Sequence, residues 1–326
     1  MLFILLTLLS LLSQETISYP LSGSSSSLRF IALGDWGGLP LPPYYTQQLL
    51  KVAKEMGTTV DKLGANFILA LGDNFYYEGV QDVNDPRFKT TFESVFAAES
   101  LRNIPWYILA GNHDHKGNVS AQIAYSNISD RWHYPDYYYD LVFKIPESNA
   151  SVRLLVMDTV LLCGNSDDNL EGQPRQPADY KIANIQLDWL TEKLQSAKEE
   201  YVLVAGHYPV WSVAEHGPTD CLVDYVQPLL KKYRVTAYLC GHDHNLQYLQ
   251  DKDGIGYILS GGGNFMENSM KHEFSVPQGY LRYFQGDPVT MGGFVYIDIT
   301  PKTMNITYIQ PGGKCLYQTT LFPRVN

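Results

Sequence analysis

Metal-ligating side chains occur in five short segments of the chain, and each segment begins with a glycine. In the segment 72–76, Asp73 is followed three residues later by Tyr76. A carboxylate and a phenol at this spacing, on a loop that leaves a strand, can both turn toward one hard cation. The other four segments supply Asp35, Asn112, His207, and the pair His242 and His244. Together the five segments predict a metal site.

Taken singly, each of these residues has an ordinary structural explanation, such as a turn aspartate, a helix-capping asparagine or a satisfied core histidine. Five segments with the same order of apolar strand, glycine and ligand are hard to explain as independent accidents. A glycine lets the backbone turn sharply where the ligand must point into the site. His242 and His244 share a face of an extended backbone, with roots about 7 Å apart, enough to serve two neighbouring metals.

Apolar runs typical of buried strands precede all five segments, over 28–33, 66–71, 104–110, 201–205 and 235–240. Helical spacing appears over 45–63, 88–96, 180–197 and 222–233. This alternation implies a mainly parallel sheet with its ligands at the carboxyl ends of the strands. Residues 117–140 are expected to form a long surface excursion. Further strands are expected over 141–145, 152–157, 246–249, 256–259, 279–284, 293–299 and 304–309. The expected fold class is α/β, with two mixed β-sheets packed as a sandwich, flanked by helices, in a single domain.

The composition limits the classes of partner. The 326 residues are 45% apolar, enough for a full core, and the formal net charge is −10. No block of basic residues is present, which argues against binding nucleic acid or an anionic membrane through a general positive field. A phosphate-bearing ligand must therefore be attracted by a local positive charge, such as a metal.

The first thirteen residues are almost all apolar and resemble the hydrophobic part of a secretory signal peptide. We expect a signal peptide over 1–20, a catalytic domain over 21–326, and a lysosomal or secreted location. Four glycosylation sequons agree with that route and predict glycosylated surface loops at Asn118, Asn127, Asn149 and Asn305.

The four cysteines are too few for a disulfide scaffold but are compatible with one structural bridge. Cys163 and Cys221 both lie in polar, loop-like sequence, so we expect them to pair. Cys240 ends an apolar strand and is expected to be a buried free thiol.

The five segments resemble the motif set of the metallophosphoesterases: 34–37, 72–76, 111–114, 206–207 and 241–244. Tyr76 narrows the resemblance to the purple acid phosphatases. The chain length, the leader and the segment 214–217 narrow it further, to the small animal-type form of that family. The resemblance covers nearly the whole chain after the leader and leaves no ligand position unfilled. It implies an acid phosphatase that hydrolyses phosphate monoesters, either small molecules or phosphoproteins, at acid pH.

The resemblance also implies two metal ions that share Asp73. The Fe(III) ligands would be Asp35, Asp73, Tyr76 and His244, and the Fe(II) ligands Asp73, Asn112, His207 and His242. Hard carboxylate and phenolate oxygens suit Fe(III), and imidazoles with an amide oxygen suit Fe(II), Zn or Mn. A hydroxide held by the metals would attack phosphorus in line with the leaving alcohol.

The resemblance assigns His113 and His216 to substrate binding and leaving-group protonation. They are the expected catalytic residues together with Asp73, and Asn112 joins them in binding substrate. The long loop 163–180, which contains Asp167 and Asp168, would restrain activity until a protease cuts it. An ordinary exposed insertion is the alternative. We expect a monomer.

Two other functions remain open at this point. The first is a two-metal phosphodiesterase or nuclease, against which Tyr76 and the lack of a basic track argue. The second is a non-catalytic secreted iron-binding glycoprotein, which the full ligand set together with His113 and His216 disfavours.

Overall fold

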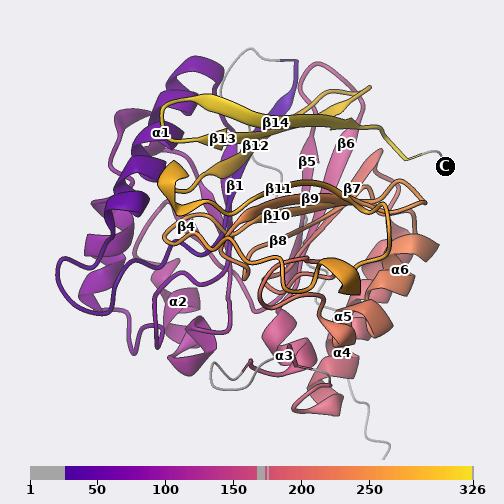
Figure 1. Cartoon of the computed structure of the whole chain (residues 1–326), viewed down its shortest axis with the longest axis horizontal. Coiled ribbons are helices and arrows are strands. Elements are labelled where there is room, and N and C mark those ends of the chain that lie inside the picture. Colours follow the sequence, from indigo (N-terminus) through magenta and orange to yellow (C-terminus); the bar gives the residue numbers. More distant parts are fainter. Residues whose placement is uncertain (1–25, 167–172, 175, 325–326) are drawn as a thin grey trace, which may run out of the picture.

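Two mixed β-sheets of seven strands each form the centre of the molecule (Figure 1). The computed structural model describes residues 26–166, 173–174 and 176–324. Helices flank the sheets on both sides, so the fold class expected from the sequence is confirmed. No helix in the described ranges is both long and apolar enough to cross a bilayer. The expected signal peptide lies outside the described residues.

The first sheet places its parallel strands beside an antiparallel extension from the C-terminal end of the chain. In spatial order it runs β14 (Lys314–Leu321), β13 (Met304–Gln310), β12 (Phe294–Ile299), β1 (Leu28–Leu33), β2 (Phe67–Leu71), β3 (Trp106–Leu109) and β4 (Trp132–His133). Strands β1 to β4 are parallel to one another. Their carboxyl ends therefore meet at one edge of the sheet.

The second sheet has the same design. Its order is β11 (Leu281–Gln285), β9 (Leu246–Gln250), β10 (Gly256–Ser260), β8 (Ala237–Cys240), β7 (Tyr201–Ala205), β6 (Ser151–Val156) and β5 (Tyr139–Lys144). Strands β6, β7, β8 and β10 are parallel, and the others pair antiparallel. Every residue of β7 and β8 is buried, as expected for strands covered on both faces.

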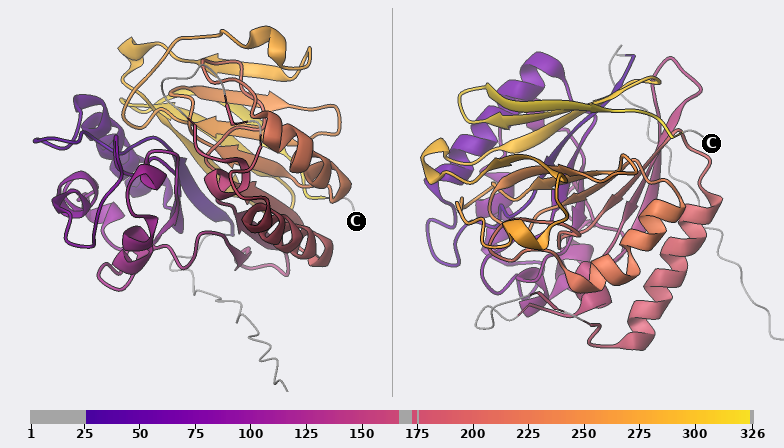
Figure 2. Two further views of the ribbon diagram at one scale, coloured as in Figure 1. Left: turned by 90° about the horizontal axis from the view of Figure 1, so that it is seen from below. Right: turned by 45° about the vertical axis from the view of Figure 1, so that its right-hand side comes forward.

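The helices cover the outer faces of the two sheets (Figure 2). Helix α1 (Gln47–Leu63) packs Leu49, Val52 and Met56 into the core of the first sheet. On the second sheet lie α4 (Tyr180–Ser196), α5 (Asp220–Tyr225) and α6 (Gln227–Lys232). Two short helices complete the set, α2 (Val119–Tyr125) and α3 (Thr159–Cys163).

Alternate residues of one strand serve different layers of the core. Leu154 of β6 belongs to the apolar cluster of the first sheet, whereas its neighbour Leu155 belongs to the cluster that includes Leu190 of α4. Successive side chains of a strand point to opposite faces. The first cluster therefore packs the sheets together and also includes the buried side of α1, and the second packs α4, α5 and α6 onto the outer face of the second sheet.

Several expectations about individual elements need correction. The helix expected over 222–233 is two helices that meet at Val226, with a proline in the first turn of α6. Residues 117–140 are not only a surface excursion, because they contain α2 and the fully buried Trp132 of β4. The short helix expected over 88–96 is a single π-helical stretch, Phe88–Glu93. Strand β14 and helix α3 were not anticipated.

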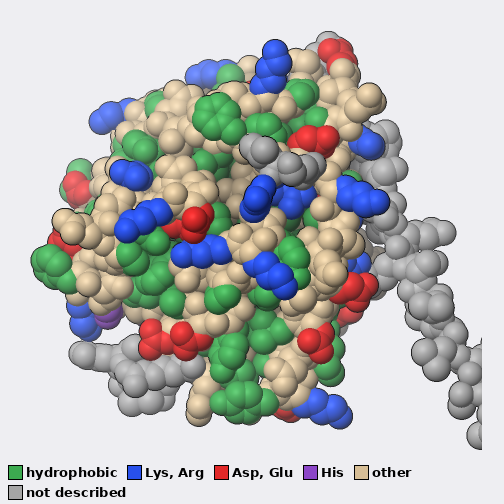
Figure 3. Space-filling view, turned by 90° about the vertical axis from the view of Figure 1, so that its right-hand side faces the viewer, with side chains coloured by type: hydrophobic (Ala, Val, Ile, Leu, Met, Phe, Trp, Pro, Cys, Tyr) green, Lys and Arg blue, Asp and Glu red, His purple; other side chains and the backbone are tan. Residues whose placement is uncertain are grey.

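One face of the molecule carries a group of basic side chains despite the negative net charge (Figure 3). A cavity of about 670 Å³ at the amino-terminal ends of β8 and β10 is lined by residues that include Lys231, Arg234 and Arg324. Lys231 pairs with Asp253, and the Arg324 guanidinium donates to backbone carbonyl oxygens. The positive charge of these two side chains is therefore directed largely to oxygens of this chain.

Candidate metal centre

The carboxyl ends of five parallel strands, three from one sheet and two from the other, meet at one buried place. Asp35 follows β1, Asp73 and Tyr76 follow β2, and Asn112 follows β3. From the second sheet, His207 follows β7, and His242 and His244 follow β8. All of these side chains are buried except His244, which is partly exposed.

Two hydrogen bonds connect the sheets at this point. The His207 Nδ1 atom lies 2.8 Å from the carbonyl oxygen of Leu71 in β2. The backbone nitrogen of His242 donates to Asp35 Oδ2 at 2.8 Å. A carbonyl oxygen only accepts, so Nδ1 of His207 carries the proton and Nε2 has a free lone pair. The His207 ring is thus oriented as a ligand.

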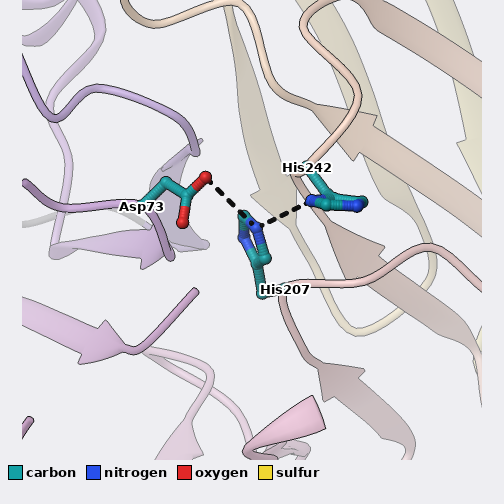
Figure 4. Close-up of side chains that lie close together, drawn as sticks. All are labelled: Asp73, His207 and His242. Carbon is teal, nitrogen blue, oxygen red and sulfur yellow. Dashed lines mark hydrogen bonds and ion pairs between the residues drawn. The ribbon is translucent and has the colours of Figure 1, made fainter. Parts of the chain in front are cut away.

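The first group of candidate ligands is Asp73, His207 and His242, whose ligand atoms all lie within 4.8 Å of one another. Figure 4 shows the His207 ring between the other two side chains. Its Nε2 atom is 3.5 Å from Asp73 Oδ2 and 3.2 Å from His242 Nδ1. Asn112 adds its Oδ1 atom, 2.9 Å from the same nitrogen. The other ring nitrogen of His242 lies 2.8 Å from the amide of Gln173.

The second group is Asp35, Asp73 and His244, which meet the same 4.8 Å limit. The Tyr76 hydroxyl donates to Asp35 Oδ1 at 3.2 Å and lies 2.9 Å from His244 Nε2. Asp73 belongs to both groups. The arrangement can therefore hold two cations with one carboxylate between them.

Glycines make room for the two carboxylates. A Cβ atom on Gly111 would collide with Asp73 Oδ1, and one on Gly241 would collide with Asp35 Oδ2. The ligand residues themselves adopt the left-handed backbone conformation that makes part of the turn, because Asp35, Asp73 and His242 have φ angles of 57°, 50° and 75°. Gly111 and Gly241 are thus required because a carboxylate approaches their backbone closely. The sequence had suggested a different reason, a sharp turn of the backbone.

The electrostatics of the site fit bound cations. Burial, together with the charge of Asp73, raises the pKa of Asp35 well above its ordinary value. Burial alone would lower the pKa of His207, but the carboxylates of Asp73 and Asp35 raise it to about 9, so its Nε2 atom strongly attracts a cation, whether a proton or a metal ion. Burial lowers the pKa of His244 to about 4, which keeps its ring neutral and able to bind a metal. Two neighbouring buried carboxylates call for positive charge, and the oxygen and imidazole donors are those that iron, zinc or manganese accept.

Comparison with known proteins agrees with this geometry. The family model described as calcineurin-like phosphoesterase matches residues 28–246. Tartrate-resistant acid phosphatase type 5 of Homo sapiens is 60% identical over 299 residues, which cover 92% of each chain. The same-named protein of Oryctolagus cuniculus is 58% identical and covers 98% of each chain.

The chain belongs to the calcineurin-like phosphoesterase family. The sequence motifs suggested a purple acid phosphatase of the small animal type. The relatives show that the chain belongs to this group. A solved purple acid phosphatase from yellow lupin seeds shares the fold, with a TM-score of 0.63 at 16% identity, over 93% of this chain and 54% of that one.

The two histidines that the family resemblance assigns to substrate flank the ligand groups. His113 donates its backbone N–H to Asp73 Oδ1 at 3.0 Å, and its Nε2 lies 4.0 Å from Asp73 Oδ2. The His216 ring stacks on His242, with centroids 4.2 Å apart. Its backbone nitrogen donates to buried Asp243 at 2.9 Å. Both rings therefore lie beside the expected ligands and are partly exposed.

A disulfide joins Cys163 and Cys221, as predicted, with Cα atoms 5.7 Å apart. It ties α3 to α5 close to the site, because Asn165 donates to the backbone oxygen of Asn112 at 3.2 Å. Cys240 is buried and free, also as predicted, and Cys315 is exposed.

Sequence reasoning missed the polar side chains that support the ligand loops. Asp114 accepts hydrogen bonds from Asn74, Gly111 and Gln122. Near them, His115 Nε2 lies 2.7 Å from Asp158, which caps α3. Asn74 and Asp114 stand inside the segments 72–76 and 111–114, so their place in the motifs was the available signal.

Proposed function

We propose that the protein is an acid phosphatase that hydrolyses phosphate monoesters at acid pH with a dinuclear metal centre. The observation that carries this proposal is the shared Asp73, which stands in both groups of candidate ligands. The purple acid phosphatase relatives support the same activity, since those at 56% to 60% identity are named as acid phosphatases.

The donor chemistry supports a division of the ligands between two different ions. Asp35, Asp73, Tyr76 and His244 would hold Fe(III), and Asp73, Asn112, His207 and His242 would hold Fe(II), Zn or Mn. When bound, two such ions supply positive charge to the phosphate and lower the pKa of the attacking water. Because both carboxylates are buried, the low dielectric around them strengthens the electrostatic attraction between these ions and the phosphate.

His113 and His216 are proposed to bind the phosphate and to protonate the leaving alcohol. The His113 Nδ1 atom lies 2.7 Å from the carbonyl oxygen of Tyr77, which only accepts, so the proton sits on Nδ1. A second proton would then go to Nε2, the nitrogen nearer Asp73, and would face a phosphate bound there. The relatives named as acid phosphatases support an acid optimum. Asn112 would contribute its amide to the same phosphate.

We further propose entry into the secretory pathway, with a signal peptide over 1–20 and a catalytic domain over 21–326. The Cys163–Cys221 disulfide supports an oxidising compartment. Asn118, Asn127 and Asn149 are exposed enough for glycosylation, whereas Asn305 is partly buried and lies in strand β13 rather than in a loop. Lysosomal and secreted locations both fit.

Processing of the loop 163–180 by a protease, and a monomeric state, stay proposals. Asp167 and Asp168 lie outside the described residues. At the described end of the loop, Gln173 reaches His242 and also accepts from the Thr219 hydroxyl at 3.4 Å. These contacts support a loop that lies against the site.

Metal analysis combined with a pH–rate profile tests the proposal. We expect two metal ions per chain, a rate maximum below pH 7 on phenyl phosphate, and slower turnover of diphenyl phosphate. Asp73→Ala should abolish turnover, whereas Asp188→Asn, on the exposed side of α4, should not change it. Tyr76→Phe should remove the visible absorption of a ferric phenolate. At most one ion per chain, or full activity of Asp73→Ala, would overturn the proposal.

A further inference from the structure

His216, one of the two histidines proposed to bind the phosphate, lies on a stretch of chain without regular secondary structure. Residues 206–219, which connect β7 to α5, form neither helix nor strand, and the segment 212–217 carries His216. The His216 ring nevertheless stacks on the ring of the expected ligand His242, with an angle of 26° between them. Loops are in general more mobile than the elements they connect. Contacts from elsewhere in the chain must therefore fix the place of this ring.

Buried polar side chains hold this segment from the inside. The Ser212 hydroxyl donates to Asp243 Oδ2, and Asp243 Oδ1 accepts from the backbone nitrogen of His216 at 2.9 Å. Gln247 donates to the Ser212 hydroxyl at 2.8 Å, and its Oε1 atom accepts from the backbone nitrogen of Val213 at 3.0 Å. Ser212, Asp243 and Gln247 are fully buried. The backbone is thus fixed on the side that faces the protein interior.

The loop that follows β10 holds the same segment from the outside. The backbone nitrogen of His272 donates to the carbonyl oxygen of Val213 at 3.0 Å. The His272 Nδ1 atom lies 2.8 Å from the carbonyl oxygen of Ala214, which only accepts, so this nitrogen carries the proton. A Cβ atom on Gly217 would collide with the His272 ring, because the ring packs directly on that glycine. His272 therefore contacts the segment on both sides of His216.

The loop after β10 is also attached to the candidate metal centre. The backbone nitrogen of Glu267 donates to the carbonyl oxygen of the expected ligand His244 at 2.7 Å. Farther along the loop, the Ser269 hydroxyl and the Lys271 ammonium group donate to the carboxylate of Glu215, at 2.7 Å and 3.0 Å. The loop thus binds the backbone of a ligand at one end and the segment with the substrate histidine at the other. It sets the position of that segment relative to the metal centre.

We propose that His272 is a positioning residue for hydrolysis, which holds the segment 212–217 so that the His216 ring stays over His242. This inference rests on the proposed phosphatase function, in which His216 binds the phosphate. A side chain fixed before the substrate binds avoids the cost of ordering it on binding, and a small misplacement near the chemistry lowers the rate. Asp243 lies between two expected ligands, so its replacement would also disturb the metals, and His272 gives the cleaner test.

A double-mutant cycle with His216 tests the proposal. In His272→Leu, which loses the Nδ1 donor, kcat/KM for phenyl phosphate should fall about 3- to 50-fold. In the His216→Ala background the same change should alter kcat/KM by less than about 2-fold, because the ring that His272 positions is absent. His272→Asn can donate from nearly the same place as Nδ1 and should recover most of the loss. His133→Leu, which removes a partly exposed histidine from β4, is the matched control and should keep the wild-type rate.

Inhibition by inorganic phosphate gives a readout without turnover. Its inhibition constant should rise in His272→Leu but should not rise further when that change is added to His216→Ala, with the metal content unchanged. If His272→Leu does not fold, Ser212→Ala removes the inner contact to Asp243 and should show the same dependence on His216. Equal losses with and without the His216 ring, or no loss in either background, would overturn the inference. An inactive wild-type protein, or full activity of His216→Ala, would instead overturn the proposed function on which it rests.

Discussion

The Asp114 carboxylate accepts hydrogen bonds from both the backbone nitrogen and the side-chain amide of Asn74, at 3.1–3.2 Å. It also accepts from the backbone of Gly111 and the amide of Gln122, each at 2.8 Å. Asn74 lies in the loop after β2, and Gly111 lies in the loop after β3. One buried carboxylate thus fastens together the two loops that carry Asp73 and Asn112. Burial and the nearby charge of Asp73 raise the pKa of Asp114 to about 6.

Replacement of Asp114 by asparagine is expected to loosen both loops. The amide has one acceptor oxygen in place of two, and its NH₂ group would face N–H donors in a buried site. We expect the free energy of unfolding to fall by about 2–4 kcal/mol, since buried donors lose their partners. Urea denaturation measures this loss, and metal analysis should show weaker retention of the ions. Asp188→Asn should change neither quantity, and equal behaviour of the two variants would contradict the role of Asp114.

The sequence located the ligand loops because their signal is local. Asp73 follows a buried strand and a glycine, and the same order recurs at Asp35 and His207. The motifs marked the position of Asp114, but neither its contacts nor those of Gln173 have a local signal, since each depends on residues brought together from distant parts of the chain. Strand β14 was missed for another reason. It is an edge strand whose residues are mostly exposed or half-buried, so no apolar alternation marks it.

Gly111 allows the Asp73 carboxylate to pack directly against the loop backbone. In Gly111→Ala the new Cβ atom would displace Asp73 from both ligand groups. We expect loss of at least one metal ion per chain and a fall in turnover of about 100-fold or more, since a misplacement of about 1 Å near the chemistry can cost that much.

Gly254→Ala is the matched control for Gly111→Ala. Nothing lies within 4 Å of a Cβ atom at Gly254, although its φ is +88°. This variant should lose about 1–2 kcal/mol of stability through backbone strain alone and keep its metals and turnover. Full metal content in Gly111→Ala would show that the carboxylate has room to move.

The His115–Asp158 pair should make stability depend on pH. Burial lowers the pKa of His115, but the charge and hydrogen bond of Asp158 outweigh it and hold the pKa above its ordinary value. Because the folded-state pKa is raised, the pair's contribution is fully present below the unfolded-state pKa of about 6.5 and is lost as the pH rises through the folded-state pKa. His115→Gln should therefore be destabilised relative to wild type more at pH 5 than at pH 8.5, as measured by urea denaturation.

His133 serves as a control, because its pKa is shifted in the opposite direction. Burial lowers its pKa, so its contribution is present when the ring is neutral and is lost as the pH falls through the folded-state pKa. His133→Gln should therefore be destabilised relative to wild type more at pH 8.5 than at pH 5. The same pH trend in both variants would show that the Asp158 pairing does not set the behaviour of His115.

Arg324 holds the C-terminal end of the chain against two helices. Its guanidinium donates to the carbonyl oxygen of Tyr233, at the end of α6, at 3.1 Å. It donates to that of Ala197, at the end of α4, at 3.2 Å, and to that of Glu199 at 2.7 Å. Helix carbonyl ends carry partial negative charge and lack partners within the helix, so one fork-shaped cation can satisfy both ends.

Arg324→Ala is expected to lower the free energy of unfolding by about 2 kcal/mol, because charge-assisted hydrogen bonds to carbonyls at two helix ends are lost. Arg324→Lys keeps the charge but not the planar fork, so it should recover only part of the loss. Turnover of folded protein should not change, since Arg324 lines the cavity at the amino-terminal end of β8 and the ligands lie beyond its carboxyl end. Thermal melting and rates measured well below the melting temperature separate the two effects. A fall in kcat in the fully folded variant would mean that the site at the carboxyl end of β8 depends on the contacts of Arg324 at its amino-terminal end. Full recovery of stability in Arg324→Lys would mean that the positive charge alone holds the helices.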